Sequence, residues 1–184
     1  MQGKRTIVLS VMLSTMLLLC FPTWALCQDQ ATPLDVKALL GSWQLVRYEV
    51  VKADNQVFLP YGSSLSGILV YLGNGRMFAA WGNQDRPRAK DPQRPTQAEL
   101  AMRLKGFDAY WGTFEVDAVR RVVIHHVEGC ITPEAIGTDR IRNVVVDGDN
   151  LILMTSPQPC GGWFKDQCAE GERVRLKLTW RKNP

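Results

Sequence analysis

The chain has 184 residues, a length that suits one domain with a core of its own, and it carries no internal repeat or block of like charge. Its formal charge of +4 falls to +2 without Lys4 and Arg5 of an expected leader, because 22 basic side chains become 20 against 18 acidic ones. So small a bias argues against nucleic acid or an anionic lipid surface as the partner.

Residues 1–27 follow the order of a secretory signal peptide. Two basic residues precede an almost unbroken apolar run over residues 7–21, and small residues and then polar ones come after it. The run is too short to span a bilayer comfortably, and no later apolar stretch is longer. Cleavage is expected after Cys27, with Ala25 as the alternative. The mature chain is predicted to be secreted or periplasmic, with no integral membrane segment.

An N-terminal arm over residues 28–40, with one helical turn near its end, leads into a predicted all-β domain over residues 41–184. Alternating segments separated by turn residues predict eight strands there: 42–52, 67–71, 76–82, 110–117, 121–128, 138–147, 151–155 and 172–181. Asn74-Gly75 is a strong hairpin signal because both residue types tolerate positive φ. Mostly short connections predict an eight-stranded antiparallel up-and-down barrel, just wide enough to hold one small ligand.

The longest connection, between the third and fourth strands, contains one predicted amphipathic α-helix over residues 96–108. Thr96 and Glu99 form a capping box, in which the threonine oxygen accepts from the Glu99 N–H and the glutamate reaches back. Leu100, Leu104 and Phe107 then recur at helical spacing. We expect this apolar stripe to pack against the barrel wall or one of its ends.

Side chains of a strand alternate between two faces, so the pattern also predicts which of them point into the barrel. The last strand places four apolar side chains together: Val174, Leu176, Leu178 and Trp180. On the first strand, simple alternation gives one inward face: Trp43, Leu45, Arg47 and Glu49.

Two strands carry the candidate polar groups of the interior. The fifth predicted strand places His126 and Glu128 on one face and His125 on the other. The sixth places Arg140 and Arg142 together. Faces that begin apolar and become polar predict a packed floor below a polar-lined cavity.

The cysteines agree with an oxidising compartment. Cys160 and Cys168 enclose a flexible loop that can close as a disulfide, which would contribute about 2.5 kcal/mol. Cys130 then remains, either as a buried thiol or as an alternative partner for one of the other two. Aromatic residues of the enclosed loop either fold over the barrel mouth or face a protein partner.

Ten different short motifs follow one another along the domain. They are Gly41-Ser42-Trp43 with Leu45-Val46, Pro60-Tyr61-Gly62, Gly67 to Tyr71, Gly75-Arg76-Met77, Arg86-Pro87, Tyr110 to Phe114, His126-Val127, Gly137-Thr138 with Arg140, Asp147-Gly148-Asp149 with Leu151, and Leu178 to Arg181. Their order and spacing resemble the bacterial and fungal lipocalin-like domain family, part of the calycin group. The resemblance implies an eight-stranded up-and-down barrel. It also implies that Trp43 packs across the barrel floor with the Arg181 guanidinium over its ring, a cation–π contact worth about 0.5–2 kcal/mol.

An apolar-floored barrel predicts an exported module that binds a small lipophilic or amphipathic molecule, such as a fatty acid or a polyketide-like compound. Five residues are candidates to line its cavity: Tyr71, Trp81, Tyr110, His126 and Arg140. Such sites are mostly apolar with a few placed polar groups, and the fork of an interior arginine suits a carboxylate. We expect no cofactor, metal or nucleic acid with this function.

Two other functions remain open from the sequence. A barrel isomerase, cyclase or hydrolase would use His126 with Glu128, or Tyr110 with Glu49, as acid–base groups, although no nucleophile-elbow motif is present. A metal or haem site would use His126, Glu128 and Cys130, whose spacing places them on one face of a regular strand.

Overall fold

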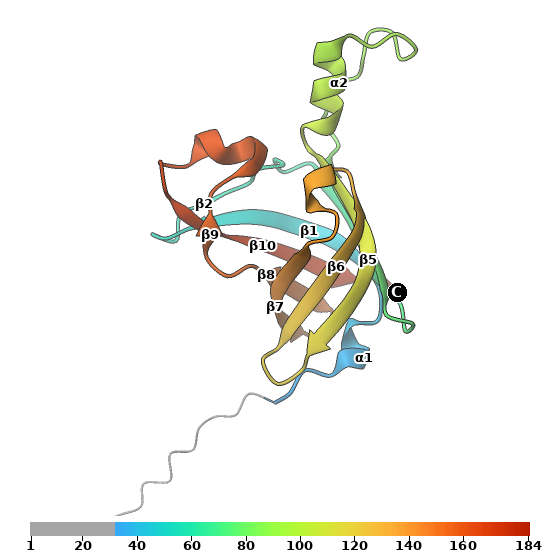
Figure 1. The fold of residues 1–184 in the computed structure, drawn as a ribbon, viewed down its shortest axis with the longest axis vertical. Helices are drawn as coiled ribbons and strands as arrows, with labels where there is room; N and C mark the ends of the chain where they lie inside the picture. Colours follow the sequence, from blue (N-terminus) through green and yellow to red (C-terminus); the bar gives the residue numbers. More distant parts are fainter. Residues whose placement is uncertain (1–31) are drawn as a thin grey trace, which may run out of the picture. The chain divides into compact units, whose positions relative to one another are not determined.

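The computed structural model describes residues 32–184, so the expected leader over residues 1–27 lies outside the described part. Within residues 32–184, eight antiparallel strands close a barrel, because β1 pairs with β3 on one side and with β10 on the other (Figure 1). The barrel strands are β1 (Gly41–Lys52), β3 (Leu65–Tyr71), β4 (Arg76–Asn83), β5 (Phe107–Asp117), β6 (Val122–Cys130), β7 (Asp139–Asp147), β8 (Asn150–Met154) and β10 (Arg173–Lys182).

The predicted barrel and the helix between its third and fourth strands are confirmed. The structure adds short elements in the long connections: β2 (Val57–Phe58) beside β1, β9 (Gln158–Pro159) beside β10, and the 3₁₀ helices η1 (Pro133–Ala135) and η2 (Gly162–Gln167). Both added strands pair where the end of β1 meets the start of β10. They therefore extend the barrel wall at one end, which we call the mouth.

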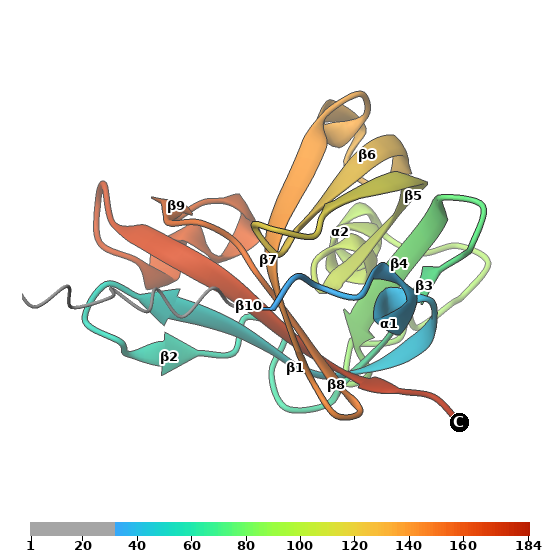
Figure 2. The same ribbon diagram turned by 90° about the horizontal axis from the view of Figure 1, so that it is seen from below.

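The other end, the floor, is closed by short turns and by the N-terminal arm. The turns between β3 and β4, β5 and β6, and β7 and β8 lie there, and α1 (Val36–Leu39) covers them. Figure 2 shows the segment before α1 crossing this end of the barrel. The Leu34 N–H donates to the Ala118 carbonyl oxygen over 2.9 Å, and Leu34 and Leu39 are buried.

Trp43 is buried in the floor, but the cation over its ring is Lys182 and not the expected Arg181. The Lys182 Nζ lies 4.7 Å from the ring centroid and donates to two carbonyl oxygens at the end of α1 over 2.8 and 3.1 Å. Arg181 is exposed. The prediction is wrong by one position because alternation turns Trp180 inward, Arg181 outward and Lys182 inward again.

A β-bulge in β1 changes which of its side chains point inward. The pairing with β10 shifts between Leu45 and Arg47, so β1 accommodates one extra residue. Beyond the bulge Tyr48 is buried in the core, while Arg47 and Glu49 form an ion pair of 2.9 Å on the opposite face. The inward direction predicted for Arg47 and Glu49 is therefore wrong, and the pairing of Tyr110 with Glu49 does not form.

The predicted helix is present, but its apolar side chains are not buried. In α2 (Gln97–Leu104) the capping box forms: Thr96 Oγ1 accepts from the Glu99 N–H over 3.3 Å, and Glu99 Oε2 accepts from the Thr96 N–H over 2.8 Å. Leu104 is 61% exposed, because α2 extends beyond the mouth instead of lying on the wall (Figure 1). No helix in the described part of the chain is long and apolar enough to cross a membrane.

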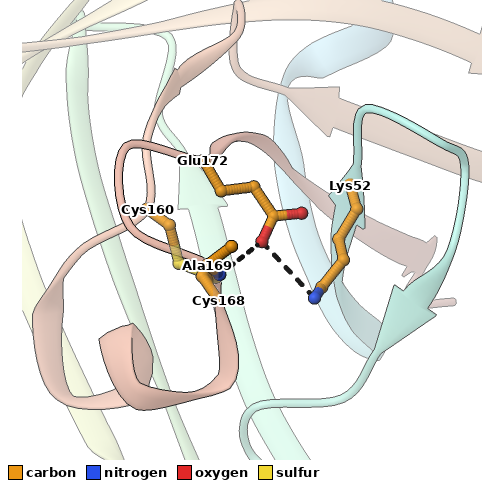
Figure 3. Close-up of a disulfide and its surroundings, with 5 residues drawn as sticks. All are labelled: Lys52, Cys160, Cys168, Ala169 and Glu172. Carbon is orange, nitrogen blue, oxygen red and sulfur yellow. Dashed lines mark hydrogen bonds and ion pairs between the residues drawn. A yellow bond between two sulfur atoms is a disulfide. The ribbon is translucent and has the colours of Figure 1, made fainter.

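The predicted disulfide joins Cys160 to Cys168 in the loop between β9 and β10 (Figure 3). Glu172 fastens the base of this loop. Its Oε2 accepts from the Ala169 N–H over 2.8 Å and lies 3.4 Å from the Lys52 Nζ of β1. The disulfide closes the loop on itself, and the ion pair with Lys52 attaches its base to the barrel wall beside the mouth.

Candidate functional site

The mouth of the barrel holds a cavity of about 500 Å³. Its lining combines apolar, aromatic and charged side chains from several strands, among them Tyr48, Trp81, Asp108, Arg140, Arg142, Leu176 and Leu178. A second hollow of about 550 Å³ shares Tyr48, Asp108 and Leu176 with it and continues towards Phe164 of the disulfide loop. We call the two hollows together the mouth cavity.

Trp81 is the centre of an aromatic cluster below the mouth cavity. Its ring centroid lies 5.9 Å from that of Tyr48, 6.0 Å from that of Tyr110 and 6.3 Å from that of Trp180. Trp81 Nε1 is buried and has no hydrogen-bond partner among the described residues. Trp81 lines the cavity, but this nitrogen is covered by other atoms, and an unsatisfied buried indole donor is rare in protein interiors.

Arg140 and Asp108 form a charged pair at the rim of the cavity. Arg140 Nη1 lies 3.3 Å from Asp108 Oδ2, the guanidinium carbon lies 4.1 Å from the Tyr110 ring centroid, and Nη2 donates to Cys130 Sγ over 3.3 Å. The two side chains of the pair are 18% and 19% exposed. The protein's own groups therefore engage the fork of Arg140. Asp108 Oδ1 has no hydrogen-bond partner within residues 32–184.

Arg142 follows Arg140 on the inward face of β7, one pair of residues closer to the floor. It stands opposite Val123 of β6, whose side chain is fully buried. Its Nη1 donates to the neighbouring Ile141 carbonyl oxygen over 2.9 Å. No acidic side chain of residues 32–184 forms an ion pair with it.

Further down, His125 lies between two tyrosines in the buried core. Tyr71 Oη lies 2.6 Å from His125 Nε2, and Tyr110 Oη lies 2.8 Å from His125 Nδ1. Burial, with the charge of Arg142 second, holds the pKa of the imidazole well below its usual value. Burial also raises the pKa of both tyrosine hydroxyls. All three groups are therefore neutral near pH 7, and the cluster contains no side chain that titrates there.

His126 points to the outer face, so the expectation that it lines the cavity is corrected: His125 occupies the interior. His126 Nδ1 lies 2.7 Å from Asp139 Oδ1 across the β6–β7 pair. Glu128 lies 2.7 Å from Arg76 Nη1 and is also outside. The proposed acid–base pair of His126 with Glu128 therefore does not form, since each group has another partner.

A second β-bulge separates the three side chains considered for a metal or haem. The pairing of β5 with β6 shifts between Trp111 and Gly112, and Glu128 is the extra residue on β6. Beyond it Cys130 packs against the core, on the opposite face from His126. The regular spacing assumed for His126, Glu128 and Cys130 is thereby broken. Within residues 32–184 no cluster of three potential metal ligands is found.

The barrel was also compared with known proteins. A protein-family model described as a lipocalin-like domain matches residues 40–183, which include every barrel strand. The chain belongs to this family. The resemblance suggested by the ordered motifs is thus confirmed over the whole domain.

One curated relative and one solved structure are similar to this lipocalin-like domain. The 4'-hydroxy-3'-methoxypropiophenone carrier protein of Aspergillus oryzae is 36% identical over 96 residues, which cover 48% of this chain and 78% of that protein. A lipocalin-like protein of known structure from Bacteroides uniformis shares 14% identity with a TM-score of 0.39, over 79% of this chain and 99% of its own.

The lipocalin-like domain places the five predicted cavity residues at different depths. Trp81 and Arg140 line the mouth cavity. Tyr110 lies directly beneath Arg140, Tyr71 lies deeper beside His125, and His126 lies outside. Ligand binding by these residues remains a prediction.

Three cavity residues were not predicted from the sequence. Tyr48 is turned inward by the bulge in β1, which simple alternation does not show. Asp108 was assigned to the end of the helix, whereas β5 begins before it. Arg142 had a usable signal, because it shares the face of Arg140 on an unbroken strand.

Proposed function

We propose that this lipocalin-like domain is a carrier that binds one small lipophilic or amphipathic molecule in the mouth cavity. The observation that carries the proposal is the cavity itself, which lies at the open end of a barrel sealed at its floor. Its first hollow alone has a volume of about 500 Å³, which is within the usual range for small-molecule sites. Apolar area comes from Leu176, Leu178 and the ring of Tyr48, and the charged groups lie around them.

The similarity to a carrier of 4'-hydroxy-3'-methoxypropiophenone supports an aromatic ligand. That molecule combines one ring with a hydroxyl that donates and a carbonyl that accepts. Trp81 and Asp108 pair across neighbouring strands and could offer a donor at Nε1 and an acceptor at Oδ1, because neither atom has a hydrogen-bond partner within residues 32–184. Both atoms are buried, so a small movement of the side chains would have to expose them to the ligand. Hydrogen bonds that complete such atoms favour binding, because leaving them unsatisfied costs about 1–3 kcal/mol each.

The carrier function is tested by calorimetric titration with 4'-hydroxy-3'-methoxypropiophenone. Wild-type protein is expected to bind one molecule. Leu176→Trp, which fills the cavity, is expected to weaken binding at least about tenfold, because the added ring takes the ligand's place. Val145→Trp adds the same ring to the outer face of β7, where the side chain is 47% exposed, and should bind like the wild type.

The outcomes of this titration test the site and separate a carrier from an enzyme. Absence of binding by the wild type, or equal binding by both variants, would contradict the mouth cavity as the site. A thermal melt of each variant shows whether a loss comes from unfolding. Mass analysis of the ligand after prolonged incubation gives the third outcome, since a chemically altered ligand would identify a barrel enzyme instead of a carrier.

We also propose that the chain is exported. The support is the leader-like order of residues 1–27 together with the disulfide, a bond that persists in oxidising compartments. Expression of the full chain in a bacterial host is expected to give a periplasmic product that begins after Cys27 and contains one free thiol, Cys130. An intact chain that stays in the cytosol with three reduced cysteines beyond the leader would contradict export.

A further inference from the structure

Two arginines and two aspartates line the mouth cavity: Arg140, Arg142, Asp108 and Asp139. Asp108 forms its ion pair with Arg140. Asp139 also borders the cavity, but its carboxylate lies 2.7 Å from His126 on the outer face. One guanidinium is therefore left without a counter-charge.

The uncompensated guanidinium belongs to Arg142. Arg140 has an ion pair, a ring face and a sulfur atom as partners, whereas Arg142 has only the carbonyl oxygen of its own neighbour, Ile141. Its side chain lines the mouth cavity from the inward face of β7, and its charge adds to the pKa fall that burial produces in His125. The side chain is partly exposed, so water solvates the guanidinium of the empty cavity, and an anionic ligand would replace that water with a charged partner.

We propose that Arg142 binds the carboxylate of the ligand, so that the lipocalin-like domain selects amphipathic acids over their neutral analogues. This inference rests on the proposed carrier function and refines it. The planar fork of arginine offers two parallel N–H donors to a carboxylate, in hydrogen bonds stronger than those between neutral groups. The strand register places Arg142 level with Thr155 and Leu176. With its acid at Arg142, the ligand extends its apolar part past Leu176 towards the mouth.

The test uses two ligands with the same ring, 4-hydroxy-3-methoxybenzoate and its methyl ester, in which an added methyl group removes the negative charge. The wild type is expected to bind the acid at least about tenfold more tightly than the ester, the ratio that one charge-assisted hydrogen bond provides. Arg142→Gln should lose this preference by weakening the acid while leaving the ester within about threefold of wild type. Arg181→Gln removes the same charge from an exposed site and should retain the preference.

Each result of the comparison is decisive. Equal affinity for acid and ester in the wild type, or an unchanged preference in Arg142→Gln, overturns the inference while the carrier function stands. If the wild type binds neither compound nor the neutral ketone, the carrier function itself fails. If the glutamine variant does not fold, Arg142→Lys replaces it in the test. The lysine keeps the charge without the fork, so this variant should retain only part of the preference for the acid.

Discussion

We expect His125→Ala to lower the free energy of unfolding by at least about 3 kcal/mol. Both ring nitrogens of His125 contact tyrosine hydroxyls, at 2.6 Å from Tyr71 and 2.8 Å from Tyr110. Truncation leaves two buried hydroxyls without this partner and opens a cavity between the rings. Urea unfolding followed by tryptophan fluorescence measures the change.

The neighbouring histidine supplies the control. His126→Ala should cost less than about 1 kcal/mol, because the contact of His126 with Asp139 is partly exposed to water. A pH series adds a second readout. Below pH about 6.5 the unfolded chain binds a proton at position 125 that the folded chain excludes, so wild-type stability should fall by up to about 1.4 kcal/mol per pH unit as pH decreases. Equal losses in both variants would contradict the buried, neutral role of His125.

Gly112→Ala is expected to destabilise the barrel by more than about 3 kcal/mol or to prevent folding. A Cβ atom on Gly112 would lie 1.9 Å from the His126 carbonyl oxygen and 3.0 Å from the Glu128 backbone nitrogen. Both atoms belong to the bulged backbone of β6, so no side-chain rotation relieves the overlap. The midpoint of thermal unfolding, or the yield of soluble protein, measures the effect.

Gly73 is the matched position for this substitution. It lies in the turn between β3 and β4, has no positive φ, and a Cβ atom there would meet no atom within 4 Å. Gly73→Ala should therefore stay within about 1 kcal/mol of the wild type. A mild effect at Gly112, similar to that at Gly73, would show that β6 does not carry the bulge described above.

The fold was largely predictable because its signals are local. Turn residues and alternating hydrophobicity marked the strands, and the capping box at Thr96 marked the start of α2. What failed was the burial of that helix. Helical spacing shows that Leu100 and Leu104 share a side, but it does not show whether the chain brings that side against the barrel.

The site was less predictable, because side-chain direction depends on register. Each bulge inserts one residue and exchanges the faces beyond it, which misplaced Glu49 in β1 and separated Cys130 from His126 in β6. No local signal showed which of His125 and His126 points into the barrel, because the residues that share a face with each of them include valine or isoleucine. Lys182 was predictable in principle, because it shares the face of Trp180.

The sealed floor has a consequence for the order in which cargo is exchanged. Since the N-terminal arm and Lys182 close the floor, a ligand bound as proposed would enter and leave through the mouth alone, and a second molecule could bind only after the first has left. The loop closed by the Cys160–Cys168 disulfide lines part of this opening. Free competitor molecules in solution would then not speed the dissociation of a bound ligand, so the dissociation rate would be a property of the barrel alone.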